Sequence, residues 1–191
     1  NSRFAHSLSN GIKLVSGEER THIVDCLFED NGSSMDHYDV WGDRRIFPSE
    51  ISGCEFRSDN PFALGIAPSA VEKLVSNTFR PDHKIRLWGT IMDASATWRN
   101  YGVHYVVSDP RLDELPLGIT IAAWPTATLT IEPGGTVEFE EGVGIFVGNE
   151  WNPGALIAQG APTSPITFTT AATDGNAHWA GLSFDESADT D

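Results

Sequence analysis

The chain has 191 residues, which is enough for one domain or for an extended array of repeats. It carries 12 Lys and Arg against 27 Asp and Glu, a formal net charge of -15 that argues against binding of nucleic acid and against docking on anionic lipid. No run approaches the roughly 18 apolar residues that a membrane-spanning helix needs, so no membrane insertion is expected.

The first 80 residues repeat a short pattern of alternating apolar residues. Residues 23–28, 51–56 and 74–79 align with one another, and residues 2–4 fit the end of the same frame. Phe recurs at positions 4, 28, 56 and 79, so the repeat is 23 to 28 residues long. Strands this short suit an architecture in which each strand pairs with its equivalent one turn later.

Residues 81–127 form the irregular middle of the chain, and we expect a junction there at which one stack of coils ends and another starts. Residues 68–74, just before it, are the best helical candidate but make a very short helix. The pattern therefore divides the chain into a first stack (1–80), a junction (81–127) and a second stack (128–191).

The second stack contains two successive triplets of short alternating segments. These segments are residues 129–131, 137–139 and 145–147, followed by 156–158, 166–168 and 182–184. Three strands for every turn of fewer than 30 residues are typical of a solenoid.

Residues 128–139, with the sequence Thr-Leu-Thr-Ile-Glu-Pro-Gly-Gly-Thr-Val-Glu-Phe, resemble a coil of bacterial right-handed parallel β-helix proteins. Pro-Ile-Thr-Phe at 165–168 and Trp-Ala-Gly-Leu-Ser-Phe at 179–184 resemble coils of the same pectate-lyase-like superfamily. The resemblance implies an all-β, right-handed parallel β-helix (a solenoid) of about seven turns with three short parallel sheets. It leaves the activity open, because this fold carries lyases, hydrolases, adhesins and surface proteins alike.

This fold predicts an interior of aromatic and aliphatic side chains. They are Phe28, Phe56, Phe79, Ile131, Phe139, Val147, Ile166, Phe168 and Phe184.

The two ends of the chain look complementary. A turn without a strand follows residues 182–184, and residues 2–4 read as a strand without a preceding turn. We therefore expect copies to associate head to tail through Ser2 and Phe4 of one copy and Leu182 and Phe184 of the next. Such contacts are heterologous and open-ended, so they produce filaments.

The leading functional hypothesis is a non-catalytic one: a structural subunit or repeat of an extracellular bacterial fibre, sheath or surface layer. Two alternatives stay open, namely a carbohydrate-binding adhesin module at the cell surface and a fragment of a β-helical polysaccharide lyase or hydrolase. Glu138, Glu140 and Glu141 are the densest carboxylates, but no catalytic arrangement can be recognised around them.

Several residues are candidates for binding. Trp98 and Trp151 lie beside loop residues and are candidates for stacking on sugar rings. The acidic turn that contains Asp185, Glu186, Asp189 and Asp191 supplies the oxygen ligands that calcium prefers, and calcium is the one cofactor considered.

Cys26 and Cys54 fall in the same position of neighbouring repeats. Adjacent strands lie ~4.8 Å apart, a spacing that a disulfide tolerates. The two residues form a disulfide, an inward ladder of packed thiols or, least favoured, part of a metal site.

Overall fold

The computed structural model describes residues 1–15, 20–32, 34, 36–43, 47–109, 117–172 and 177–188. The chain is all-β, with 48% of its residues in strands and 4% in helix, and the sheets are parallel, as the sequence predicted. Among the described residues, no helix is long and apolar enough to cross a membrane.

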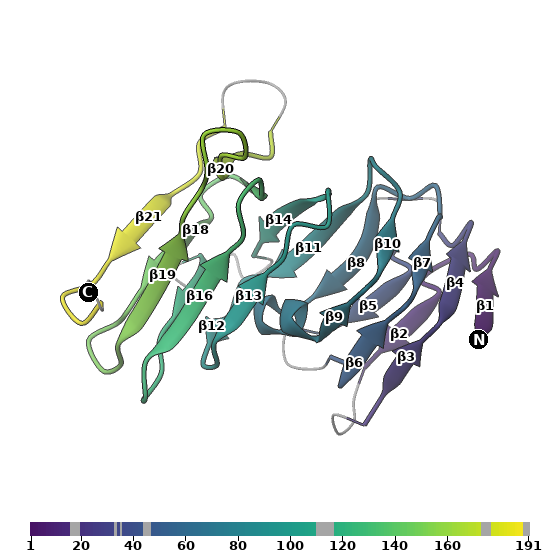
Figure 1. Ribbon diagram of the computed structural model, residues 1–191, viewed down its shortest axis with the longest axis horizontal. Helices are drawn as coiled ribbons and strands as arrows, with labels where there is room; N and C mark the ends of the chain where they lie inside the picture. Colours follow the sequence, from purple (N-terminus) through teal and green to yellow (C-terminus); the bar gives the residue numbers. More distant parts are fainter. Residues whose placement is uncertain are drawn as a thin grey trace.

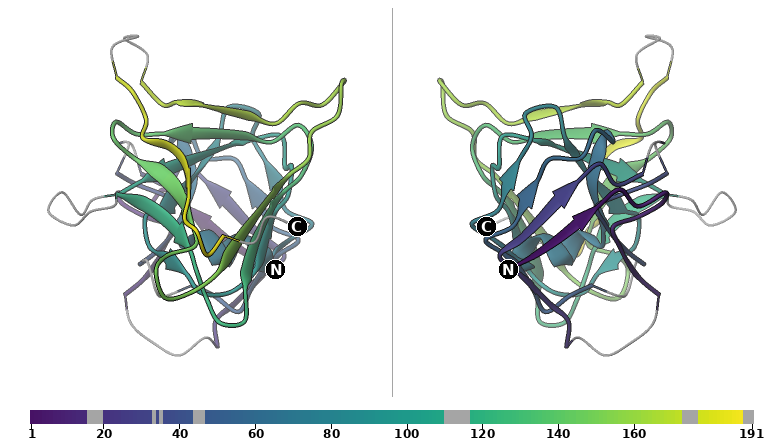
Figure 2. Two further views of the ribbon diagram at one scale, coloured as in Figure 1. Left: turned by 90° about the vertical axis from the view of Figure 1, so that its left-hand side faces the viewer. Right: turned by 90° about the vertical axis from the view of Figure 1, so that its right-hand side faces the viewer.

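Within every sheet, neighbouring strands are three places apart in the chain. The two strands between them provide the connection that parallel pairing requires. Figure 1 shows the strands side by side from the N-terminal end to the C-terminal end, with the two termini at opposite ends of the molecule. Seen along this axis in Figure 2, the strands lie on the sides of a roughly three-sided outline.

One sheet, here called the long sheet, runs the whole length of the described chain. Its strands are, in spatial order, β2 (Ile12–Leu14), β5 (Val40–Gly42), β8 (Phe62–Ile66), β11 (Lys84–Trp88), β14 (His104–Ser108), β17 (Thr136–Phe139) and β20 (Thr167–Thr170).

The other two sides of the outline carry a first and a second pair of side sheets. The first pair consists of β1 (Ser2–Ala5), β4 (Cys26–Glu29), β7 (Glu55–Phe56) and β10 (Thr78–Phe79), and of β3 (His22–Val24), β6 (Glu50–Ser52) and β9 (Leu74–Val75). The second pair consists of β12 (Ile91–Met92), β15 (Gly118–Ile121), β18 (Gly144–Val147) and β21 (Gly181–Phe184), and of β13 (Ala96–Trp98), β16 (Ala127–Ile131) and β19 (Gly154–Ala158).

The described chain thus has five sheets rather than the expected three, because both side sheets are interrupted where the first pair gives way to the second. A 3-10 helix, η1 (Pro68–Lys73), lies at this break, so the segment expected to be a very short helix is one. The Glu72 carboxylate accepts a hydrogen bond from the backbone N–H of Thr97 at 2.7 Å. A side chain thereby replaces the neighbouring strand on this side, while the long sheet continues through β11 and β14.

The first half of the core is a stack of phenylalanine rings. Phe4, Phe28, Phe56 and Phe79 are partners in register, and successive ring centroids lie 5.0, 4.9 and 4.9 Å apart with nearly parallel planes. Identical residues stack because neighbouring coils are superimposed in register. The sequence alignment of these repeats is therefore confirmed.

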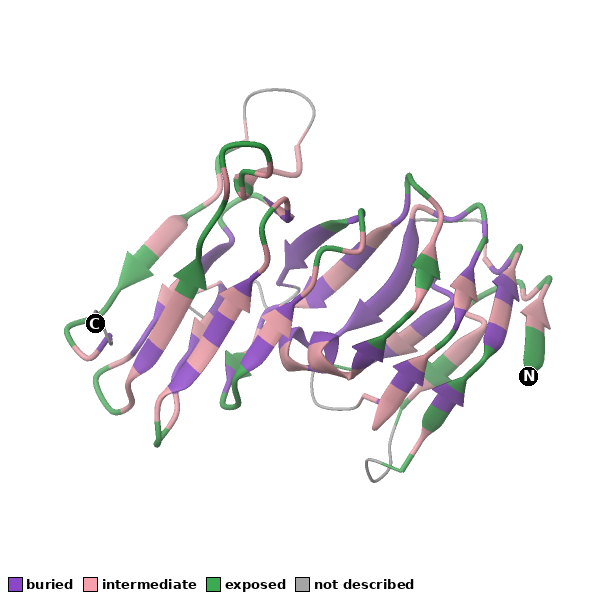
Figure 3. Ribbon diagram, in the orientation of Figure 1, coloured by how far each residue is buried: buried purple, intermediate pink, exposed green. Residues whose placement is uncertain are grey.

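The second half has a looser core. Phe139 is fully buried and stacks on Trp179 at 4.6 Å between centroids, but Phe168 and Ile166 of the predicted interior are only half-buried. In the first half, Phe79 at the end of the phenylalanine stack is also only half-buried. Burial falls off toward both ends of the molecule in Figure 3.

The prediction of a buried Phe184 is wrong, since 57% of this residue is exposed. Phe184 pairs with the buried Val147, but its strand β21 is the outermost of its sheet, so no further strand packs over it.

Candidate functional site

The outer face of the long sheet carries the chemically distinctive side chains of the molecule. In β11, Ile85 and Leu87 are fully buried in the core, so the alternating residues Lys84, Arg86 and Trp88 point outward. This face is opposite the core, so it is available to a ligand that approaches from solvent.

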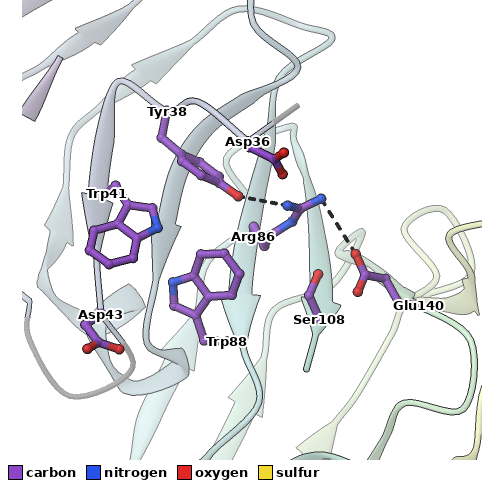
Figure 4. Close-up of a pocket in the computed structure, with 8 residues that line it drawn as sticks. All are labelled: Asp36, Tyr38, Trp41, Asp43, Arg86, Trp88, Ser108 and Glu140. Atoms are coloured by element: carbon purple, nitrogen blue, oxygen red, sulfur yellow. Dashed lines mark hydrogen bonds and ion pairs between the residues drawn. The ribbon is translucent and has the colours of Figure 1, made fainter. Parts of the chain in front are cut away.

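A pocket of about 480 Å³ lies on this face. It is lined by Asp36, Tyr38, Trp41, Asp43, Arg86, Trp88, Ser108 and Glu140 (Figure 4). Three of these eight residues are aromatic, three are acidic and one is basic. Small-molecule sites usually span about 300–1,000 Å³, so the pocket is large enough for a ligand.

Gly65 makes room for the aromatic side of the pocket. It is paired in register with Trp41 on one side and with Arg86 on the other. A Cβ atom at this position would lie 3.0 Å from both Trp88 Cζ2 and Tyr38 Cε1, so the two rings cover the space that a side chain would fill.

Specific contacts hold the rings in place. Trp88 Nε1 donates a hydrogen bond to the carbonyl oxygen of Gly42 at 2.9 Å, and the rings of Tyr38 and Trp88 meet edge to face with centroids 6.0 Å apart. The backbone N–H of Tyr38 donates to Asn10 Oδ1 at 2.8 Å. The aromatic surface is therefore organised before any ligand arrives.

Arg86 lies among these rings and is neutralised there. Its Nη1 donates to the Tyr38 hydroxyl at 2.8 Å, its Nη2 lies 3.6 Å from Glu140 Oε1, and its guanidinium carbon lies 4.0 Å from the Phe62 ring centroid. Only 14% of the Arg86 side chain is exposed. Burial raises the pKa of Tyr38 above its usual value, and the Arg86 charge opposes that rise. The Tyr38 hydroxyl is therefore neutral, and it accepts a hydrogen bond from Arg86.

Two buried polar atoms of the lining residues have no hydrogen-bond partner. They are Ser108 Oγ, on a residue that is 3% exposed, and Arg86 Nε. Buried donors and acceptors are almost always satisfied in native proteins, by water where no protein group is near. Both atoms are closed off from solvent, so a bound molecule does not reach them without a rearrangement of the lining.

A cluster of buried polar residues, here called the polar column, supports the pocket from behind. It consists of Asn31, Asp39, Ser58, Asn60 and His83, which lie in turns that lead into the long sheet. The Asp39 carboxylate accepts hydrogen bonds from Asn31 Nδ2 at 3.1 Å and from the Ser58 hydroxyl, and His83 Nε2 donates to the Ser58 carbonyl at 2.7 Å. Because Asp39 directly follows Tyr38, the column holds the strand segment that presents this ring.

Burial in the polar column shifts two pKa values. Desolvation raises the pKa of Asp39 to about 6, although the hydrogen bonds from Ser58 and Asn31 oppose it. Desolvation lowers the pKa of His83, so its neutral form is favoured. The column thus contains a carboxyl group that titrates close to neutral pH.

A second polar cluster lies beside the pocket on the same face. Glu138 is 8% exposed, and its two carboxylate oxygens lie 2.7 Å from Lys84 Nζ and 2.6 Å from His104 Nδ1. Lys84 and His104 are direct partners in register on β11 and β14. With the proton on Nδ1, the Nε2 atom of His104 is a hydrogen-bond acceptor on a side chain that is half exposed.

Only one of the two predicted sugar-stacking tryptophans reaches the surface. The assignment of Trp98 to ligand binding is wrong: the residue is fully buried, packs on Tyr105 and donates from Nε1 to the carbonyl oxygen of Pro68 at 3.1 Å. Trp151 is 78% exposed in the turn after β18, but it does not line the pocket.

Sequence reasoning does not identify Tyr38 and Arg86 as site residues, and it leaves Trp41 and Trp88 open between packing in the fold and binding a ligand. The alternation of Lys84, Arg86 and Trp88 with buried aliphatic residues was a local signal for β11. The sequence did not indicate that Trp41 lies close to the outward-facing residues of β11. That proximity depends on the strand register, in which Gly65 pairs with Trp41 on one side and with Arg86 on the other.

The structure places part of the predicted calcium site. Asp185 and Glu186 are exposed, and Asp185 Oδ1 accepts a hydrogen bond from the backbone N–H of Ser187 at 3.2 Å. Asp189 and Asp191 lie outside the described residues. Within the described ranges, no three His, Cys, Asp or Glu side chains are placed to share a metal ion. Calcium binding at this turn stays a prediction.

Cys26 and Cys54 are buried free thiols. Cys26 Sγ donates to the carbonyl oxygen of Val24 at 3.2 Å, and Cys54 Sγ lies 3.3 Å from that of Ser52. Burial raises the pKa of the Cys54 thiol, which favours its protonated form. This arrangement is the packed thiol ladder, one of the alternatives that the sequence left open.

The comparisons with known proteins add no relative: no family model, no curated protein and no solved structure matches the chain.

Proposed function

We propose that this protein binds a glycan in the pocket on the outer face of the long sheet. The observation that carries the proposal is the pair of tryptophans, Trp41 and Trp88, that line one pocket together with carboxylates. An indole face packs against the C–H face of a sugar ring, and flanking polar groups bind its hydroxyls.

The proposed scaffold is a right-handed parallel β-solenoid of about seven turns. It is supported by the regular pairing, within every sheet, of strands three places apart and by the seven described strands of the long sheet. A solenoid is a stiff platform on which coils far apart in sequence present side chains on one face. An extracellular or cell-surface location belongs to the same proposal, since that is where such glycans are met.

Titration with a panel of purified oligosaccharides, followed by tryptophan fluorescence and by calorimetry, tests this function. Trp88→Ala and Trp41→Ala are expected to weaken binding at least 10-fold, because each removes a stacking surface. Trp124→Ala and Trp151→Ala are matched controls, since these residues are 83% and 78% exposed and lie outside the pocket lining. Absence of binding to every oligosaccharide, or equal losses in the pocket and control variants, would overturn the proposal.

The second candidate function is end-to-end assembly into a non-catalytic extracellular fibre. Exposed Phe184 on β21 and the exposed edge of β1 beside Phe4 favour it, because parallel coils of another copy can extend both edges. Electron microscopy and light scattering distinguish the two outcomes. Filaments that Phe184→Ser abolishes support assembly, whereas a monomer at all concentrations contradicts it.

A further inference from the structure

The charge of the pocket lining indicates which kind of glycan it suits. Among the residues that the structure describes, the lining contains three acidic residues, Asp36, Asp43 and Glu140, and one basic residue, Arg86. The chain as a whole is also strongly acidic. A negatively charged ligand meets an unfavourable field here, and a positively charged ligand a favourable one.

Arg86 does not provide a binding site for an acidic sugar. Its guanidinium is already engaged by the Tyr38 hydroxyl, by Glu140 and by the ring of Phe62, and its side chain is largely buried. To bind a ligand carboxylate in the bidentate manner typical of arginine, it has to give up these contacts. Arg86 is better placed as a structural partner of the rings.

The aromatic rings of this face already hold cations of the protein itself. Lys13 Nζ lies 5.0 Å from the ring centroid of Trp41, and the Arg86 guanidinium lies 5.9 Å from that of Trp88. Cations are attracted to aromatic faces by the ring quadrupole. The face therefore provides both components of an ammonium site, ring surface and carboxylate.

We propose that the pocket selects an amino sugar, that is, a glycan unit with a free ammonium group. In this arrangement the sugar ring packs on Trp41 and Trp88, and a rim carboxylate such as Asp36 or Glu140 binds the ammonium group. This inference rests on the proposed glycan binding and specifies its ligand class.

Three tetrasaccharides of equal length test the inference: glucosamine, N-acetylglucosamine and galacturonate. Binding is measured at about pH 5.5, where the glucosamine amine is protonated. We expect the glucosamine tetramer to bind at least 10-fold more tightly than the other two. Salt is expected to reduce that preference, because the rim is partly exposed.

Two variants sharpen the result, with Glu186→Gln as the control for loss of an exposed carboxylate far along the chain. Asp36→Asn is expected to weaken glucosamine binding 3- to 10-fold and to leave N-acetylglucosamine binding unchanged. Lys13→Met is expected to strengthen glucosamine binding, since it removes a competing ammonium group from Trp41. For an acidic ligand, Lys13→Met is instead expected to weaken binding, because it removes an attractive positive charge.

The outcomes separate the two proposals. Tighter binding of N-acetylglucosamine or galacturonate, still sensitive to Trp88→Ala, overturns the amino-sugar inference and leaves glycan binding intact. No binding of any tetramer, at either low or high salt, overturns both.

Discussion

The first and second halves of the molecule hold their coils together in different ways. The first half combines a continuous stack of phenylalanine rings with the polar column, whose five members are buried and hydrogen-bonded across coils. The second half relies on aliphatic side chains and on the pair of Phe139 and Trp179. The pocket takes its aromatic residues from the first half and from β11, while Ser108 and Glu140 come from farther along the chain. The comparison indicates that the polar groups buried in the first half help to position Tyr38.

The largest expected effect on stability distinguishes the core of the first half from the core of the second half. Phe56→Ala removes a fully buried ring between two others, and we expect a loss of about 3–5 kcal/mol in the free energy of unfolding. Phe168→Ala, at a half-buried site, is expected to cost less than half as much. Chemical denaturation measures both, and equal losses contradict the comparison.

The polar column predicts a pH dependence that the second half lacks. The pKa of Asp39 is about 6 when folded and close to 4 when unfolded, so the folded state binds the proton more tightly. Stability from this group is therefore full below about pH 4 and is lost as pH rises through 6, by about 3 kcal/mol at most.

Asp39→Asn tests that dependence, because asparagine keeps an acceptor for Asn31 and Ser58 but does not titrate. Thermal unfolding of both proteins from pH 4 to 7 gives the difference curve. A slope that persists unchanged in Asp39→Asn contradicts the assignment to Asp39. The buried His83 cannot supply that slope, because its lowered pKa makes stability rise with pH.

Glu138→Gln addresses the polar cluster beside the pocket. Lys84 and His104 then lose their shared carboxylate but remain partly exposed, so we expect a loss of about 1–2 kcal/mol rather than the larger cost of a fully buried pair. Glu55→Gln is the control, since it breaks an exposed contact with Arg57 that is worth less than about 1 kcal/mol. Urea denaturation at pH 7 compares the two.

Gly65→Ala is expected to change stability little but to displace the aromatic rings that line the pocket. The added methyl group meets Trp88 and Tyr38 at 3.0 Å, so the rings have to shift by a few tenths of an ångström. We expect a changed tryptophan fluorescence spectrum and oligosaccharide binding at least threefold weaker, with a stability change below about 1 kcal/mol. An unaltered spectrum contradicts the close packing of these rings.

Much of the fold could be predicted because it repeats. The Phe positions and the alternating segments around them specified the strands and their register, since like residues stack when coils are superimposed. The break between the side sheets was less predictable. It depends on η1 and on side-chain hydrogen bonds across the break, such as that between Glu72 and the backbone N–H of Thr97.

Most of the candidate site could not be predicted from the sequence, because it too depends on contacts that do not repeat along the chain. Trp98 and Trp88 are each the last residue of a short strand, yet one is fully buried against Tyr105 and the other lines the pocket. Which side a residue faces follows from local alternation, but what covers that side is decided by coils more than 20 residues away.

By itself, the sequence determined the all-β class, the length of the repeat and the stacked phenylalanines, because these properties depend on the periodicity of apolar residues. Only the tertiary structure decided which tryptophans are exposed, how Arg86 is neutralised and where carboxylates meet aromatic rings. Those properties arise from contacts between coils, and such contacts depend on register and side-chain volume at positions like Gly65 rather than on any pattern along the chain.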